Sequence, residues 1–133
     1  MKWTIIDGLK YTKKHEWVRR EDSDLVTVGL TDYAQDKLGE IVFVELPDVG
    51  AAVEAGKGAA VVESVKAVAD LYAPADGEIA AVNEDLLDQP ELINREPYEG
   101  GWVLKIKVVD GSQVDALMDK TVYEGFVAEE EEK

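Results

Sequence analysis

The chain has 133 residues, of which 46% are hydrophobic and 32% are charged. This size and composition are typical of a single globular domain over residues 1–133, and they exclude a multidomain protein and a disordered chain. With 29 acidic and 14 basic residues, the formal net charge is −15. We therefore expect repulsion from nucleic acid and from anionic membranes, and a monomer that meets other proteins transiently.

Several kinds of site lack the residues they need. The chain has no cysteine and one histidine, His15. It therefore has no disulfide, thiolate metal site or cysteine nucleophile, and His15 alone cannot build a multi-imidazole metal site. Because Glu16 and Trp17 follow it in a polar segment, we expect His15 to be solvated or locally hydrogen-bonded. We predict no catalytic residue and no bound metal.

The apolar runs are short. The longest, such as 41–44 and 59–62, have four residues, far fewer than the ~20 of a membrane-spanning helix. Residues 1–20 contain no unbroken apolar stretch like that of a secretory signal. We expect no membrane partner, and a location in the bacterial cytoplasm or, for a processed eukaryotic chain, in the mitochondrial matrix.

The first predicted elements are a strand, a short helix and a second strand. Residues 26–30 are apolar enough for a strand, and Thr31 can cap a helix over 32–38 that ends at Gly39. Residues 41–44 place apolar side chains on both faces, which indicates a strand buried on both sides.

The middle of the chain predicts further strands. Residues 59–72, AAVVESVKAVADLY, are rich in β-branched residues and favour strands over a helix. The segment GEIVFVE at 39–45 returns as GEIAAVN at 77–83, which suggests two similar β units packed against each other. The glycines on either side of Lys57 lack the spacing of a phosphate-binding loop and predict a turn.

The last third of the chain predicts a loop, a strand and helix. Residues 84–101 are rich in turn-forming residues and should be mostly loop, whereas 102–109 return to a strand. Apolar positions within 114–126 follow helical spacing and predict an amphipathic helix or two short ones. Residues 129–132 are expected to fray as a solvated acidic end. The predicted fold is mainly β, a sandwich or small barrel with short helices and a C-terminal helix.

Lys66 is the residue that most needs an explanation. It lies within an apolar run, between Val65 and Ala67. Periodicity favours an exposed position on an edge strand or at a hairpin tip, where a lysine blocks unwanted strand pairing. The neighbouring residues lack the Asn-Gly or Asp-Gly signal of a tight hairpin, so local sequence leaves its position open.

The segment ESVKA at 63–67 resembles the lipoylation site of lipoyl-domain proteins. Further segments, in the same order, resemble one family, the H protein of the glycine cleavage system: YTKKHEW at 11–17, VGLTDYAQDKLGEIVFVELPDVG at 28–50, YAPADGEI at 72–79 and VNEDLLDQPELINREPYEGGW at 82–102. The resemblance covers roughly residues 8–126.

The resemblance implies a hybrid barrel-sandwich fold with Lys66 at the tip of a hairpin, where its amine is acylated by lipoate. Its neighbours Glu63, Ser64, Val65 and Ala67 would be what the attaching enzyme reads. Biotin carriers share the architecture but typically place methionine on both sides of the lysine. Val65 and Ala67 therefore argue against biotin.

The resemblance also implies a role and a set of partners. The protein would be a carrier, not an enzyme, that takes an aminomethyl group from a pyridoxal phosphate glycine decarboxylase (P protein) to a tetrahydrofolate-dependent aminomethyltransferase (T protein). Dihydrolipoyl dehydrogenase (L protein) would then reoxidise it, and a lipoate-attaching enzyme would load it. A carrier without cysteine offers no thiol that could trap the arm in a mixed disulfide.

The loaded arm ends in a cationic amine that carboxylates could shelter. By resemblance, Glu16 and Asp70 are the candidates, although both could be ordinary surface acids. Lys14 departs from the usual pattern and could repel the amine or pair with Glu16. Two other functions stay open: an unmodified acidic interaction module, and an H-like lipoyl donor for other complexes.

Overall fold

The computed structural model describes residues 2–133 and contains two antiparallel sheets. The six-stranded sheet has the order β1-β2-β3-β9-β8-β5, and the three-stranded sheet has the order β4-β6-β7. The strands are β1 (Lys10–Tyr11), β2 (Glu16–Arg20), β3 (Leu25–Leu30), β4 (Ile41–Glu45), β5 (Ala52–Val53), β6 (Gly58–Ser64), β7 (Val68–Tyr72), β8 (Gly77–Val82) and β9 (Leu104–Val108). The helices are α1 (Asp32–Leu38), α2 (Asp85–Asp88), α3 (Leu92–Arg95), α4 (Ser112–Asp115) and α5 (Lys120–Glu131).

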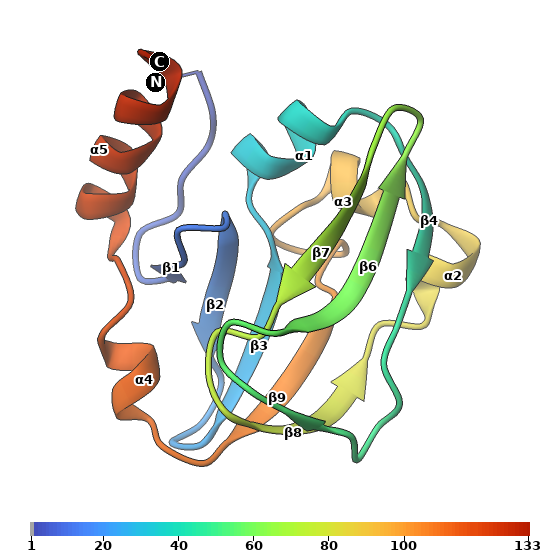
Figure 1. The fold of residues 1–133 in the computed structure, drawn as a ribbon, viewed down its shortest axis with the longest axis vertical. Helices are drawn as coiled ribbons and strands as arrows, with labels where there is room; N and C mark the ends of the chain where they lie inside the picture. The colour runs from blue at the N-terminus through green and yellow to red at the C-terminus, as the bar shows by residue number, and fades with distance from the viewer. Residues whose placement is uncertain (1) are drawn as a thin grey trace.

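The two sheets face each other across one apolar core. This core includes Ile106 and Ile79 from the larger sheet and Val44, Val62 and Leu71 from the smaller one. A second, aromatic cluster lies where α5 packs on the N-terminal segment and β1, on the far side of the molecule from β4, β6 and β7 (Figure 1). No strand is shared between the sheets, so they form a sandwich and not a closed barrel. The predicted mainly β fold with short helices and a C-terminal helix is confirmed.

Helix α1 begins and ends where its sequence predicts. The Thr31 hydroxyl accepts a hydrogen bond from the N–H of Ala34 at 3.1 Å, which caps the first turn. Gly39 ends the helix with φ of 84°, a conformation that favours glycine. This ending directs the chain into β4, beside the β6–β7 hairpin.

The expectation that residues 41–44 are buried on both faces is wrong. Ile41 and Val44 are buried, but Val42 and Phe43 are 48% and 50% exposed. The pairing of β4 with β6 shifts register between Ile41 and Phe43. Such a bulge adds one residue to the strand and re-aims its side chains, so both intervening side chains face solvent.

The repeated segment forms one strand in each sheet. Its first copy is β4 and its second is β8, where the register shifts between Ile79 and Ala81. These positions lie 38 residues after Ile41 and Phe43. The two copies therefore share a bulge as well as a sequence pattern, and both Ile41 and Ile79 are buried in the common core.

Residues 84–101 lie mostly outside regular secondary structure, as predicted, although α2 and α3 each form one turn there and bury Leu86 or Ile93. The expectation for residues 129–132 needs correction. The acidic end does not fray, because α5 continues to Glu131, whose carboxylate accepts a hydrogen bond from the Tyr33 hydroxyl at 2.7 Å. Among residues 2–133, no helix is both long and apolar enough to cross a membrane.

Candidate functional site

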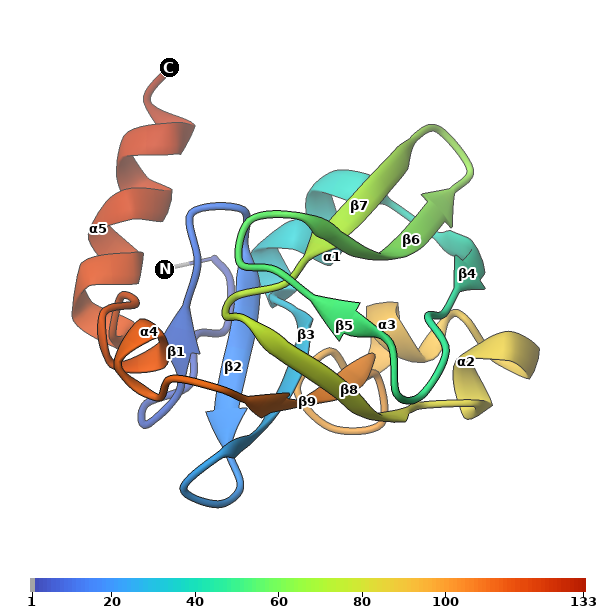
Figure 2. The same ribbon diagram turned by 60° about the horizontal axis from the view of Figure 1, so that its bottom comes forward.

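Lys66 lies at the tip of the hairpin that joins β6 to β7. Glu63 and Val68 form the last cross-strand pair, so residues 64–67 make the turn. The hairpin extends past its sheet beside α1 and β4 (Figure 1) and projects from the molecule when viewed from below (Figure 2). Lys66 is exposed, so its amine is accessible to another protein.

The Ser64 side chain builds this turn. Its hydroxyl oxygen accepts hydrogen bonds from the N–H groups of Lys66 and Ala67 at 3.2 and 3.0 Å. The Ser64 N–H donates to the carbonyl of Ala67 at 2.8 Å and closes the hairpin. Serine hydroxyls can replace the backbone bonds of a turn. The hairpin therefore forms without the Asn-Gly or Asp-Gly signal that the sequence lacks.

The tip is also fixed to the segment between α1 and β4. The Val65 N–H donates to the carbonyl of Glu40 at 3.0 Å. A Cβ at Gly39 would lie 3.6 Å from Lys66 Cε, so the lysine stem runs past this glycine. The segment between α1 and β4 therefore stabilises the turn in addition to Ser64.

Asn94 supports this segment from below, and the sequence did not single it out. Its side-chain oxygen accepts from the N–H of Ile41 at 2.8 Å, and its amide nitrogen donates to Gln35 and to the carbonyl of Gly39, both at 2.9 Å. It therefore ties the end of α1 to the start of β4. A polar residue in a predicted loop gives no signal for such a role.

A pocket of about 200 Å³ lies between α1 and β7, on the Lys66 side of the molecule. Apolar groups, two lysines, a tyrosine, a histidine and one carboxylate line it. They are Lys14, His15, Leu30, Tyr33, Ala34, Lys37, Leu38, Ala69 and Asp70. Asp70, which is exposed on β7, supplies the carboxylate.

Glu16 lies beneath the surface. It is 1% exposed, and its carboxylate accepts hydrogen bonds from the Thr12 hydroxyl and from the N–H of Tyr72 at 3.0 Å. Burial raises its pKa, while these two bonds and the charge of Lys14 act in the opposite direction. Glu16 is not among the residues that line the pocket. It connects β2 to the end of β7, two residues beyond Asp70.

Lys14 and His15 line the pocket together with Asp70 and residues of α1. The Lys14 ammonium lies 5.6 Å from the centre of the Tyr72 ring, and it makes no ion pair with Glu16 within residues 2–133. His15 Nδ1 lies 2.8 Å from the Tyr123 hydroxyl of α5. His15 is therefore bonded to a helix remote in sequence, where solvation or a local bond was expected.

These features describe an exposed amine at a hairpin tip and a partly apolar pocket bordered by β7 of the same hairpin. Lys66 has no carboxylate or imidazole in its turn that would act with it as an acid–base pair.

Comparison with known proteins identifies the family. The model of the glycine cleavage H-protein family matches residues 9–130. The chain belongs to the glycine cleavage H protein family. It is 57% identical over 122 residues to the glycine cleavage system H protein of Citrobacter koseri and 56% identical to that of Escherichia coli, covering 92% of this chain and 95% of each relative.

A solved structure agrees with this assignment. The crystal structure of a glycine cleavage system H protein from Mycobacterium marinum superposes with a TM-score of 0.82 at 38% identity, covering 91% of this chain and 97% of that one. The predicted family and the lipoyl-carrier fold are thereby confirmed.

Membership of the glycine cleavage H protein family settles the general role. The chain is a lipoyl-bearing shuttle of the glycine cleavage system and is not itself a catalyst. Glycine cleavage H proteins carry lipoate covalently on a lysine, and they act with the P, T and L proteins and with a lipoate-attaching enzyme.

Proposed function

We propose that Lys66 is the lysine of this shuttle that carries lipoate, within one carrier domain formed by residues 1–133. The observation that carries the proposal is the position of Lys66 at a projecting hairpin tip, with its stem beside Gly39 and its amine exposed. Residues Glu63, Ser64, Val65 and Ala67 form the turn context that the attaching enzyme meets.

The attachment is a simple acyl transfer. The neutral Lys66 amine attacks the carbonyl carbon of an activated lipoyl group held by the attaching enzyme. The C–N bond forms, the bond to the leaving group breaks with its electron pair, and Nζ loses a proton. The attached lipoate supplies a disulfide at the end of a long apolar arm, which accepts and releases its cargo by exchange at sulfur.

Intact mass after co-expression with a lipoate ligase tests this proposal. The parent chain should gain one lipoyl group, and Lys66→Arg should gain none because a guanidinium is a poor acyl acceptor. Lys57→Arg is the matched control, since Lys57 is also exposed and lies in the turn at the opposite end of β6. An adduct that persists in Lys66→Arg would refute the assignment.

We infer that the pocket between α1 and β7 receives the arm. Its residues fit the group: Leu30, Ala34 and Leu38 can contact the apolar chain, and the Asp70 carboxylate can pair with the cationic amine of the cargo. The burial of Glu16 supports an indirect role for that residue, namely holding β7 in place through the Tyr72 N–H.

Substitution of Asp70 tests its sheltering role. Asp70→Asn should still gain one lipoyl group, but the loaded chain should release ammonia faster than the parent does. Asp48→Asn, which changes an exposed acid outside the pocket, should behave as the parent does. Ammonia release at the parental rate in Asp70→Asn would contradict the sheltering role.

The bacterial relatives support a bacterial cytoplasmic location. Cell fractionation with an antibody to the chain would test it. Recovery of the chain in a membrane or secreted fraction would be the contrary result.

A further inference from the structure

Large apolar side chains gather around Lys66 on the outer face of the three-stranded sheet. Nine large hydrophobic residues are exposed among residues 2–133, and four of them lie here. Val65 and Val68 are each 67% exposed at the hairpin, and Val42 and Phe43 are about half exposed on β4. We refer to these four residues as the tip patch.

Strand register places Phe43 and Val68 of the tip patch on one face of the sheet, and the bulge turns Val42 toward solvent next to Phe43. Phe43 pairs with Glu63 on β6, and Glu63 pairs with Val68 on β7. Residues directly opposite each other in adjacent strands point to the same face. The alternate positions, Val44 and Val62, are buried in the core. The patch therefore faces away from the core.

The fold does not require large side chains at these positions. The repeated strand β8 has the same bulge, and there Ala80 and Ala81 stand where β4 has Val42 and Phe43. The backbone thus accepts alanine in both bulge positions. Apolar side chains gathered on a solvent-facing surface are a mark of an interaction site. Only the copy in the sheet that bears Lys66 has them.

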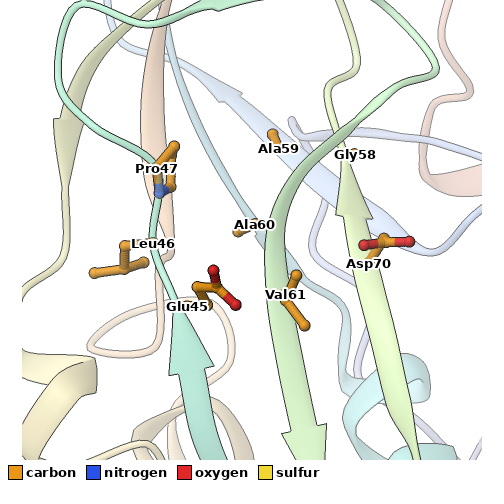
Figure 3. A pocket seen from close by; sticks show the side chains of 8 residues that line it. All are labelled: Glu45, Leu46, Pro47, Gly58, Ala59, Ala60, Val61 and Asp70. Carbon is orange, nitrogen blue, oxygen red and sulfur yellow. The ribbon is translucent and has the colours of Figure 1, made fainter.

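Carboxylates border the tip patch. The next row across the sheet is Glu45, Val61 and Asp70. Figure 3 shows Glu45 pointing toward β6 and Asp70 on the other side of that strand, at the two sides of a shallow pocket of about 200 Å³. Within residues 2–133, neither of these acids nor Glu63 is paired with a basic side chain. The surface fits a partner with an apolar patch bordered by lysine or arginine.

We propose that the tip patch is the surface on which the lipoate-attaching enzyme docks, an inference that rests on lipoylation at Lys66. Before modification, the amine reaches no further than the lysine side chain. The attaching enzyme must therefore lie directly against the residues beside Lys66. The other partners meet the longer lipoyl arm and can stand further from the tip.

Steady-state lipoylation of the purified chain by lipoate ligase, with lipoate and ATP, tests this docking surface. The double variant Val42→Ala/Phe43→Ala gives β4 the residues that β8 has at its bulge. It should raise the KM for the carrier about tenfold with little change in kcat, because it truncates apolar contacts made on binding. Val109→Ala/Val122→Ala, which truncates two exposed valines outside the tip patch, should change KM by less than about twofold.

A second variant guards against misfolding. Val68→Thr changes the patch from the other edge of the sheet while keeping a β-branched residue of similar shape, and it should raise KM in the same direction. Parental KM values in both tip-patch variants would overturn the inference. A parental lipoylation rate combined with slower transfer from glycine decarboxylase would assign the patch to that enzyme instead.

Two further results are distinguishable from these. If sedimentation shows a dimer that Val42→Ala/Phe43→Ala dissociates, the occupant is a second copy of the chain and the inference is wrong. If Lys66→Arg is still lipoylated, the attachment site lies elsewhere, and the result refutes lipoylation at Lys66 and not the docking surface alone.

Discussion

Replacing Ser64 with alanine tests how the turn presents Lys66. The change leaves the N–H groups of Lys66 and Ala67 without their shared acceptor. A neutral hydrogen bond contributes a net ~0.5–1.5 kcal/mol, and the lower half of that range applies at a tip where water can replace the lost acceptor. The two bonds together predict a loss of ~1–2 kcal/mol in the free energy of unfolding.

Thermal unfolding followed by circular dichroism measures this loss. For a chain of this length, Ser64→Ala should lower Tm by ~4–7 °C. It should also reduce kcat/KM for lipoylation by no more than ~30-fold, the factor that corresponds to ~2 kcal/mol. Ser23→Ala is the control, because Ser23 is exposed in the turn between β2 and β3 and its hydroxyl makes no hydrogen bond within residues 2–133. Equal Tm values for the two variants would refute the account of the turn.

Three further predictions concern α5, His15 and β8. Glu131→Gln weakens the contact with the Tyr33 hydroxyl, so amide hydrogen exchange at the end of α5 should become faster. An unchanged exchange rate would show that this contact does not hold the end of the helix. Burial lowers the pKa of His15 below its usual 6.5. As the pH falls, His15 is therefore protonated in the unfolded chain before it is protonated in the folded chain. The stability due to neutral His15 is lost as the pH falls below 6.5. The excess stability of the parent over His15→Asn, measured by urea unfolding, should therefore shrink from pH 7.5 to pH 5.5, and a growing excess would contradict the assignment. Gly77→Ala would place a Cβ 2.2 Å from the carbonyl oxygen of Lys107, which should lower the free energy of unfolding by about 3 kcal/mol. A urea midpoint equal to that of the parent would show that β8 and β9 can move apart without loss of stability.

The sequence predicts elements well where local chemistry decides them. The helix over 32–38 follows from Thr31 as a cap and Gly39 as a stop, and the structure uses both. Strand β3 follows from its apolar residues alone. In each case the side chains that determine the element lie within it or next to it.

The sequence fails where distant parts of the chain decide the structure. The exposure of Phe43 depends on a bulge set by pairing with β6, and the order of the acidic end depends on Tyr33 and Lys37 of α1. The hairpin tip was uncertain because Ser64, not a glycine, makes the turn. The burial of Glu16 depends on the Tyr72 N–H, 56 residues away.

The sequence predicts part of the candidate site. The residues around Lys66 resemble a lipoylation site, and the family supports this interpretation. The sequence does not predict the role of Asn94, which fixes the segment behind the tip, or the tip patch, because neither a single asparagine nor a pair of apolar strand residues has a distinctive pattern. Both become visible only when β4 is placed against β6.

The position of the lipoyl group is the most direct test of the account. The chain would be isolated from its own cells, digested and sequenced by tandem mass spectrometry. We predict a lipoyl amide on Lys66 and none on Lys57. An unmodified Lys66, or a lipoyl group on another lysine, would contradict it.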